Sequence, residues 1–381
     1  MGVVIDYTSG FFEAAPTGET VGSITGNATL DLTSGNVFSH TPTANTTFAF
    51  SNPPASGTGY DFTLKVTGAN VTAGYDIANA SYDSVSFSVS GQESAPRGIF
   101  FKPDGYKMYV IGEGSDTVNQ YDLSTAWDVS SASYVQNFSV ATQENRPTSV
   151  FFKPDGTKMY VLGRAGDDVN EYDLSTAWDI STASYLQNFS VSVQDNTPWG
   201  IFFKPDGTKM YMSGLSNDSI FEYDLSTAWD ISTASYSQNY SVATQENTPT
   251  EVNFNPDGTK LFVLGNQNDS VYEYDLSTAW DISTASYNSV SFSLTSQEAN
   301  PYGFRFSTDG LKMYVLGFDK FVYQYSTGSS ALATIAYPSS VKWAGGTAPT
   351  APANGETDVY SFFTTDGGTN YYGFQAGDAL A

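Results

Sequence analysis

The sequence contains no cysteine and a single histidine, His40. Disulfide bonds, thiolate metal sites and a cysteine nucleophile are therefore excluded. His40 lies outside the repeated part of the chain described below, so a Ser-His-Asp triad cannot form within the repeats. We interpret His40 as a structural or an exposed residue. The sequence has no Walker loop, G-x-G-x-x-G or histidine-rich metal motif, and we expect no cofactor.

Basic residues are also scarce. The 381 residues include 15 Lys and Arg against 40 Asp and Glu, which gives a formal net charge of −25. Binding to a nucleic-acid backbone relies on Lys and Arg, so we expect no nucleic-acid partner. Because no run approaches about 18 consecutive apolar residues, we expect no membrane insertion either.

The residues that are abundant favour an all-β fold. Tyr and Phe number 26 each. Together with Thr, Val and Ser they dominate the periodic segments, and these residue types suit half-buried pleated surfaces. No long apolar segment has the 3.6-residue period of a helix.

The chain is organised around a repeated unit, clearest over residues 151–198. Its Pro-Asp-Gly turn recurs every 51 residues (154 − 103, 205 − 154, 256 − 205), at Pro103, Pro154, Pro205 and Pro256, with an altered copy at Ser307-Thr308-Asp309-Gly310. Repeats of this length point to a solenoid, a propeller or an array. Each unit contains four strand-like pieces, and Pro-Asp-Gly joins the first two as a hairpin turn.

One strand of the array is displaced in sequence. Residues 82–90 resemble the last strand of the fourth type, at 286–295, whereas the array ends after a strand of the third type near Val322. If the array closes into a ring, residues 82–90 supply the missing outer strand of the final unit, which removes an open edge. We therefore predict a five-bladed β-propeller over residues 75–326.

The segments on either side of the array also read as strands. Residues 27–74 and 327–381 alternate apolar and polar residues between Gly, Pro and Asn, and residues 359–374 predict a hairpin about an Asp-Gly turn. We predict that they form one split, antiparallel β-sandwich-like domain into which the propeller is inserted. An N-terminal arm would cover residues 1–26.

Two resemblances extend this interpretation. The units "FKPDGTKMYVLG" and "VNEYDLSTAWDIS" resemble repeats of the NHL/YVTN-type propeller families, over residues 98–326. The flanks, with "YDFTLKV" and "YPSSVKWAGGTAPT", resemble two consecutive halves of a module found at the C-termini of bacteriophage tail-fibre and other virion proteins. The second resemblance implies a virion structural protein of a fibre, tail tip or capsid surface, exposed on the particle after assembly in the host cytoplasm. It also implies contacts with other virion proteins through the split domain, and a homotrimer.

Positions that differ among the nearly identical blades mark a candidate binding surface. They follow either the loop proline or the glycine that ends the second strand, and propeller geometry places both on one face around the channel. The charged and aromatic members are Arg97, Glu113, Arg164, Trp199, Tyr302 and Phe318. We expect them to bind a host-surface glycan or protein, because function tends to lie in loops on a rigid scaffold. The alternatives are drift in exposed loops, and a purely structural protein that decorates the particle.

The residues that recur in four of the five predicted blades have structural explanations. Four aspartates precede the third strands and are either turn residues or calcium ligands, namely Asp116, Asp167, Asp218 and Asp269. Four tryptophans in "STAWD" are expected to pack between blades. Paired carboxylates could form a glycan-cleaving site, but a catalytic pair should be unique to one or two blades. Because the acidic residues noted here recur in four blades, we expect no enzyme.

Overall fold

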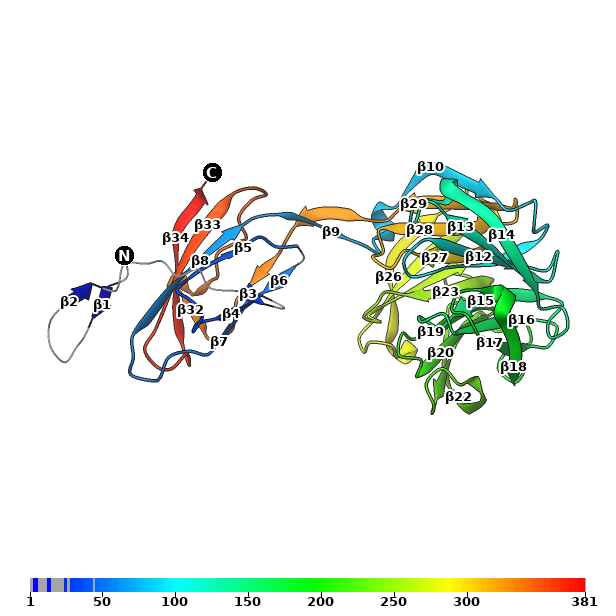
Figure 1. The fold of residues 1–381 in the computed structure, drawn as a ribbon, viewed down its shortest axis with the longest axis horizontal. Coiled ribbons are helices and arrows are strands. Elements are labelled where there is room, and N and C mark those ends of the chain that lie inside the picture. The colour runs from blue at the N-terminus through cyan, green and yellow to red at the C-terminus, as the bar shows by residue number, and fades with distance from the viewer. Residues whose placement is uncertain (1–2, 6–11, 15–23, 26–27, 44, 381) are drawn as a thin grey trace. The chain divides into compact units, whose positions relative to one another are not determined.

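The computed structural model describes residues 3–5, 12–14, 24–25, 28–43 and 45–380. The chain forms two compact units, one of residues 1–73 with 330–381 and one of residues 74–329 (Figure 1). The expected arm at residues 1–26 lies largely outside the described residues. Within it, β1 (Val3–Ile5) pairs antiparallel with β2 (Phe12–Ala14).

Within the described residues, the unit 74–329 contains five four-stranded antiparallel sheets, which are the five predicted blades. The first two blades consist of β11 (Pro96–Phe101), β12 (Lys107–Gly112), β13 (Thr117–Leu123) and β14 (Ala132–Ser139), then β15 (Pro147–Phe152), β16 (Lys158–Gly163), β17 (Asp168–Leu174) and β18 (Ala183–Ser190). The next two consist of β19 (Pro198–Phe203), β20 (Lys209–Gly214), β21 (Ser219–Leu225) and β22 (Ala234–Ser241), then β23 (Pro249–Phe254), β24 (Lys260–Gly265), β25 (Ser270–Leu276) and β26 (Ala285–Ser293).

The fifth blade confirms the predicted closure of the ring. It consists of β27 (Pro301–Phe306), β28 (Lys312–Gly317), β29 (Phe321–Ser326) and, as its outer strand, β10 (Ser81–Ser88) from the start of the unit. Strand β10 pairs antiparallel with β29 from Ser81 to Ser88. The first strands of successive blades lie side by side, and β27 lies beside β11, so the ring is complete.

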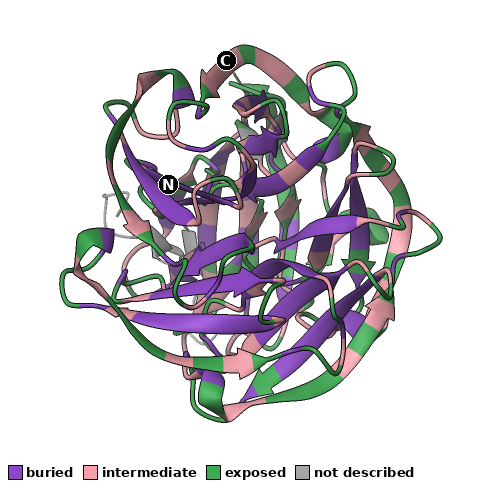
Figure 2. Ribbon diagram, turned by 90° about the vertical axis from the view of Figure 1, so that its right-hand side faces the viewer, coloured by how far each residue is buried: buried purple, intermediate pink, exposed green. Residues whose placement is uncertain are grey.

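The core lies between neighbouring blades. Figure 2 shows buried residues along the inner strands and exposed residues along the outer strands and loops. Trp178 of the second blade stacks on Phe152 of the same blade and on Phe100 of the first, with ring centroids 5.6 and 6.4 Å apart. Its carbonyl oxygen accepts a hydrogen bond of 2.7 Å from Tyr109 of the first blade. The tryptophans therefore pack between blades, as predicted.

Each of the "STAWD" tryptophans leads into a one-turn 3-10 helix that begins the fourth strand. These helices are η2 (Val129–Ser131), η3 (Ile180–Thr182), η4 (Ile231–Thr233) and η5 (Ile282–Thr284), with η1 (Ile77–Asn79) before β10. An aspartate caps each one, as Asp179 accepts a hydrogen bond from the backbone N–H of Ser181. No helix in the described part of the chain has the length and apolarity needed to cross a membrane.

The other unit joins the two flanking segments in one core. A five-stranded sheet has the order β32 (Val341–Trp343), β34 (Tyr371–Leu380), β33 (Thr357–Thr364), β8 (Tyr60–Thr67) and β5 (Val37–His40). Smaller sheets contain β3 (Ile24–Thr25), β4 (Thr29–Asp31) and β7 (Ala49–Ser51), then β6 (Thr46–Thr47) with β31 (Ile335–Ala336), and β9 (Asn70–Ala73) with β30 (Ser329–Leu332). The remaining 3-10 turn is η6 (Ala344–Gly346).

The sheets of this unit are mixed, not purely antiparallel. The predicted hairpin forms as β33 and β34, but β5 pairs in parallel with β8, and β32 pairs in parallel with β34. Parallel neighbours need a crossover connection, and the residues between β5 and β8 provide one by forming β6 and β7. Short alternating segments do not reveal the direction of such pairs. His40 ends β5, where its ring lies edge-on to Phe48 with centroids 5.3 Å apart.

Candidate functional site

The inner strands place equivalent residues at three successive levels of the propeller axis. At the level nearest the strand starts, these residues are Arg97, Thr148, Trp199, Thr250 and Tyr302. The middle level contains Gly98, Ser149, Gly200, Glu251 and Gly303. The level nearest the Pro-Asp-Gly turns contains Phe100, Phe151, Phe202, Asn253 and Arg305. Glu251 of the fourth blade breaks the small-residue pattern of the middle level, and Asn253 and Arg305 of the fourth and fifth blades break the phenylalanine pattern of the last level.

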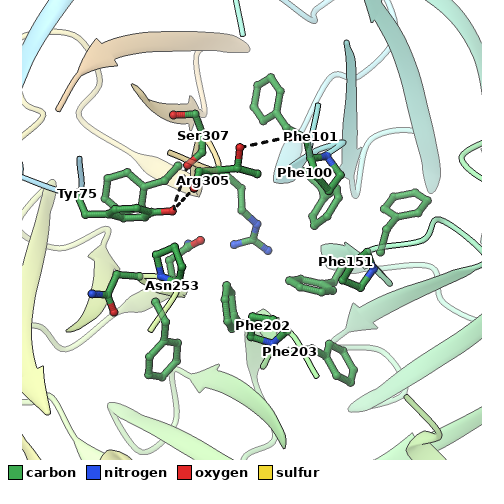
Figure 3. Close-up of a pocket in the computed structure, with 18 of the residues that line it drawn as sticks. Tyr75, Phe100, Phe101, Phe151, Phe202, Phe203, Asn253, Arg305 and Ser307 are labelled. Carbon is green, nitrogen blue, oxygen red and sulfur yellow. Dashed lines mark hydrogen bonds between the residues drawn. The ribbon is translucent and has the colours of Figure 1, made fainter. Parts of the chain in front are cut away.

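A cavity of about 330 Å³ opens at the end of the axis where the Pro-Asp-Gly turns lie. Rings from all five blades form its wall, and Phe100, Phe151 and Phe202 contact one another in sequence, with centroids 5.1 and 5.5 Å apart. Arg305 is the only charged residue among the described residues that line it. Figure 3 shows the Arg305 guanidinium at the centre of this ring of aromatic side chains. The site is therefore an apolar pocket with a single fixed cation.

Arg305 is held by a buried ion pair with the neighbouring blade. Its Nη1 atom lies 3.1 Å from Oε1 of Glu251, and the two residues are 5% and 1% exposed. Nη1 also donates to the carbonyl of Phe304, and Nη2 donates across the axis to the carbonyl of Ile201, each at 3.0 Å. The third nitrogen, Nε, is buried without a partner. These contacts fix the guanidinium in place and leave the N–H of Nε unpaired.

The carboxylate of Glu251 accepts hydrogen bonds from two further groups. The hydroxyl of Ser149 donates to Oε2 at 3.2 Å, and the backbone N–H of Val252 donates to Oε1 at 3.1 Å. Burial raises the pKa of Glu251 to about 7, although Arg305 and these two donors act in the opposite direction. Desolvation of the charged form thus outweighs the ion pair. At neutral pH the group is present both as carboxylate and as carboxylic acid, which suits proton transfer.

Asn253 adds a neutral polar group to the cavity wall. Its Nδ2 donates to the carbonyl of Phe304 at 2.8 Å, which ties the fourth blade to the fifth beside Arg305. The side chain of Asn253 is 3% exposed. Asn253, Arg305 and Glu251 are therefore neighbouring polar groups contributed by the fourth and fifth blades.

The six residues predicted from the loops meet at the other end of the axis. The guanidinium of Arg97 lies 4.3 Å from the Tyr302 ring and 5.7 Å from the Trp199 ring, and that of Arg164 lies 4.7 Å from Trp199. Glu113 bridges the two arginines, with N–O distances of 3.6 and 2.5 Å. Phe318 contacts Tyr302 edge-on at 6.2 Å. Arg97 and Trp199 are only 8% and 4% exposed. Drift in exposed loops therefore does not explain why the residue type differs among blades at these two positions.

The four aspartates considered as calcium ligands occupy turns. Asp116, Asp167, Asp218 and Asp269 have φ angles of 51°, 47°, 47° and 47°, in the left-handed region. The carbonyl of each accepts the N–H of the residue that follows the fourth strand, as Asp167 does from Val191. Among the described residues, no group of three or more His, Cys, Asp or Glu is arranged to hold a metal ion. The aspartates therefore fasten the start of the third strand to the end of the fourth.

Sequence reasoning missed Glu251, Asn253 and Arg305. The signal was present, because the repeat has Gly or Ser where Glu251 stands and Phe where Asn253 and Arg305 stand. Loop positions do not include these residues, because Glu251 and Asn253 lie in the inner strand β23 and Arg305 lies in β27. We expected no enzyme because the acidic residues recur among blades. Glu251 is a carboxylate found at this position in one blade alone.

Comparison with known proteins identifies a propeller family. The family described as "Lactonase, 7-bladed beta-propeller" matches residues 68–184 and 150–279. These overlapping segments together cover more than half of the 381 residues. The described residues of this chain build five blades, not seven. No curated protein matches the chain.

Several solved structures are similar to part of the chain. Candidate 6-phosphogluconolactonases from Bacteroides uniformis and Bacteroides fragilis are each 16% identical, with TM-scores of 0.37 and 0.38, and in both cases 52% of this chain and 55% of the other is covered. A protein from Lactobacillus plantarum is 18% identical with a TM-score of 0.36, over 50% of this chain and 53% of that one. The chain thus covers about half the length of these proteins. At TM-scores this low, the functional argument rests on the family match.

The family match supports the predicted β-propeller and overturns the predicted role. A non-enzymatic virion structural protein, displayed on a particle for host attachment or decoration, conflicts with a match to a lactonase family over the repeat array. The location on a virion surface and the absence of enzyme activity were wrong for the same reason. The flank resemblance that implied the virion role rested on short segments outside the matched repeats, and the expectation of no enzyme rested on acidic residues that recur among the blades. The homotrimer and the predicted partner proteins remain predictions.

Proposed function

The chain belongs to the lactonase family of seven-bladed β-propellers, and from this membership we propose that it is a lactonase-type hydrolase. The reaction adds water to the carbonyl carbon of a cyclic ester and opens the ring to a hydroxy acid. The observation that carries the proposal is the buried Glu251–Arg305 pair beside a cavity lined with aromatic rings.

Arg305 is proposed to stabilise the negative charge that develops on the carbonyl oxygen. Its guanidinium lines the cavity and has an unpaired N–H at Nε, while its contacts with Glu251, Phe304 and Ile201 hold it in a fixed position. Fixed donors in a site from which water is largely excluded are worth more than donors in bulk water, because no reorganisation is needed as the charge forms.

Glu251 is proposed to act as the general base. The carboxylate takes a proton from the attacking water as the oxygen of that water bonds to the carbonyl carbon. The ring C–O bond then breaks, and the carboxylic acid returns the proton to the leaving alkoxide, so that Glu251 ends as it began. A pKa of about 7 fits both steps at neutral pH. We therefore expect kcat to rise with pH through about 7.

The wall of the cavity favours an apolar lactone. Its volume of about 330 Å³ is at the lower end of the range for small-molecule sites. A phosphorylated sugar lactone would need several cations and many hydrogen-bond partners, whereas the described lining offers one guanidinium among mainly aromatic and proline side chains. A γ- or δ-lactone with an alkyl or phenyl substituent suits these rings better than gluconolactone does.

The test is acid release from a panel of lactones, followed in a pH-stat. We expect Glu251→Gln to lower kcat on the best substrate by about 100-fold or more, and Arg305→Gln to lower it to a similar extent. Lys342→Gln, an exposed charge change in the other unit, is the control. Absence of turnover of every lactone by the wild-type chain, or an unchanged kcat in Glu251→Gln, would rule out this function for the site.

A further inference from the structure

The arginines of this acidic protein are concentrated near the propeller axis. The sequence has four, Arg97, Arg146, Arg164 and Arg305. Arg305 lies in the cavity described above, whereas Arg97 and Arg164 lie at the opposite mouth, where they share Glu113. Arg146 is close enough to act electrostatically on Arg164. Arg97 and Arg164, both largely buried, thus share the single carboxylate of Glu113, and these three groups together carry one net positive charge in a chain of net charge −25.

Buried donors of this cluster also lack acceptors. The Nε atoms of Arg97 and Arg164 and the Nε1 atom of Trp199 are buried without a hydrogen-bond partner. Leaving a buried donor unpaired costs about 1–3 kcal/mol, and such groups in a native structure call for an explanation. A bound carboxylate would balance the positive charge and pair with the free donors, because it is negatively charged and has only acceptor atoms.

The cluster also presents aromatic surface. Trp199 and Tyr302 are stacked, with centroids 5.5 Å apart, and the Phe318 ring lies at the edge of Tyr302 with 49% of the residue exposed. Apolar area of this kind beside a guanidinium pair is typical of recognition sites. We propose that Arg97, Arg164, Trp199, Tyr302 and Phe318 form a second binding site, for a small carboxylate that carries a flat apolar group.

This site differs in chemistry from the cavity at the other end of the axis. There a single guanidinium is matched by Glu251, and the pair is electrically neutral when Glu251 is ionised. Here the two guanidinium groups exceed the carboxylate by one charge. The second site therefore selects an anion, whereas the first accepts a neutral carbonyl compound.

The test is isothermal titration with benzoate, and it needs no substrate turnover. It is therefore independent of whether the chain hydrolyses lactones. We expect saturable binding of one benzoate per chain, at least fivefold tighter than binding of acetate or inorganic phosphate, because only benzoate satisfies both the donors and the rings. We also expect the affinity to fall with added salt.

Variants locate the site. Arg164→Gln should weaken benzoate binding at least tenfold, and Arg164→Lys, which keeps the charge but loses the planar fork, should weaken it less. Lys153→Gln, an equal loss of charge beside the Pro-Asp-Gly turn of the second blade, should stay within twofold of the wild type. Circular dichroism establishes that each variant is folded.

Three results would overturn the proposal. The first is equal affinity for benzoate, acetate and phosphate, which would leave the rings without a role. The second is undiminished binding in Arg164→Gln and Arg164→Lys. The third is binding that is lost in Arg305→Gln and retained in Arg164→Gln, which would place benzoate in the other cavity.

Discussion

The Nη1 atom of Arg305 lies 3.1 Å from the Oε1 atom of Glu251, in a contact that joins the fourth and fifth blades at the propeller axis. Neither residue has a charged counterpart at the equivalent positions of the first three blades. The pair therefore breaks the near fivefold repetition of the inner strands beside the aromatic cavity. A polar pair that is not repeated, on a repeated scaffold, is the arrangement expected of a site grafted onto a fold.

The pH dependence of stability should reveal Glu251. Its folded-state pKa of about 7 lies above the value of an unfolded chain, near 4.3. Between these values the folded state binds more protons than the unfolded state, so the contribution of Glu251 to stability falls as pH rises through about 7. Glu251→Gln cannot titrate. We therefore expect urea melts at pH 4 to 8 to show that the unfolding free energy of the wild type falls, relative to that of the variant, as pH rises. A difference that does not vary with pH would contradict the raised pKa.

Asn253→Phe should close the candidate site while preserving the fold. The substitution restores the phenylalanine found at this position in the first three blades, so the added ring extends an existing ring of aromatic contacts. It also removes the hydrogen bond to the carbonyl of Phe304. We expect lactone hydrolysis to fall at least tenfold with a change in unfolding free energy below about 2 kcal/mol. Unchanged kcat/KM would show that the reaction takes place elsewhere.

Asp83→Ala should loosen the closure of the ring. The carboxylate accepts from Lys312 at 2.6 Å, from Ser326 at 2.6 Å and from Gln324 at 3.0 Å, and so fastens β10 to the last blade. Burial raises the pKa of Asp83, but these partners together outweigh it and hold the pKa below its usual value. We expect a loss of about 1–3 kcal/mol at pH 7, measured by denaturant unfolding.

The same substitution should matter less in acid. Because the folded-state pKa is lowered, the stability due to Asp83 is present at neutral pH and disappears as pH falls through that pKa. Asp122→Ala is the matched control, since Asp122 pairs with Lys107 at the same 2.6 Å but with 48% of its side chain exposed. Equal losses in the two variants would mean that ring closure does not depend on Asp83.

Tyr160→Phe should weaken the contact between the second and third blades. The hydroxyl of Tyr160 donates to the carbonyl of Trp229 at 2.7 Å in a fully buried position, and the substitution leaves that carbonyl unpaired. The expected cost is about 1–3 kcal/mol of unfolding free energy. Tyr185→Phe removes a hydroxyl from a residue that is 43% exposed and should stay within about 0.5 kcal/mol of the wild type. Thermal and urea unfolding of both variants provide the comparison.

Much of the propeller could be read from its repeats. The spacing of the Pro-Asp-Gly turns predicted five units, and the likeness of residues 82–90 to 286–295 predicted that β10 completes the last blade. Both inferences compare the chain with itself, and internal repetition makes such a comparison reliable. The mixed pairing in the other unit was not predicted, because alternation of apolar residues is the same in parallel and antiparallel strands.

The candidate site was only partly accessible to such reading. Comparison of the blades identified the cluster of Arg97, Glu113 and Arg164, whose members are unusual for their positions in the repeat. It did not identify Glu251 and Arg305, which are 54 positions apart (305 − 251) and belong to strands that appeared to be scaffold. Their pairing depends on which strand edges face the axis.

The sequence by itself determined the all-β class, the number of blades and the closure of the ring. Turn chemistry and residue alternation are local properties, and they recur in the repeats along the chain. The tertiary structure alone decided which residues act together. Glu251 acquires its raised pKa from burial at the axis, and Arg97 meets Trp199 and Tyr302 only because the third and fifth blades return to the same channel. Desolvation and proximity across blades arise when the ring closes, and no local pattern in the sequence records them.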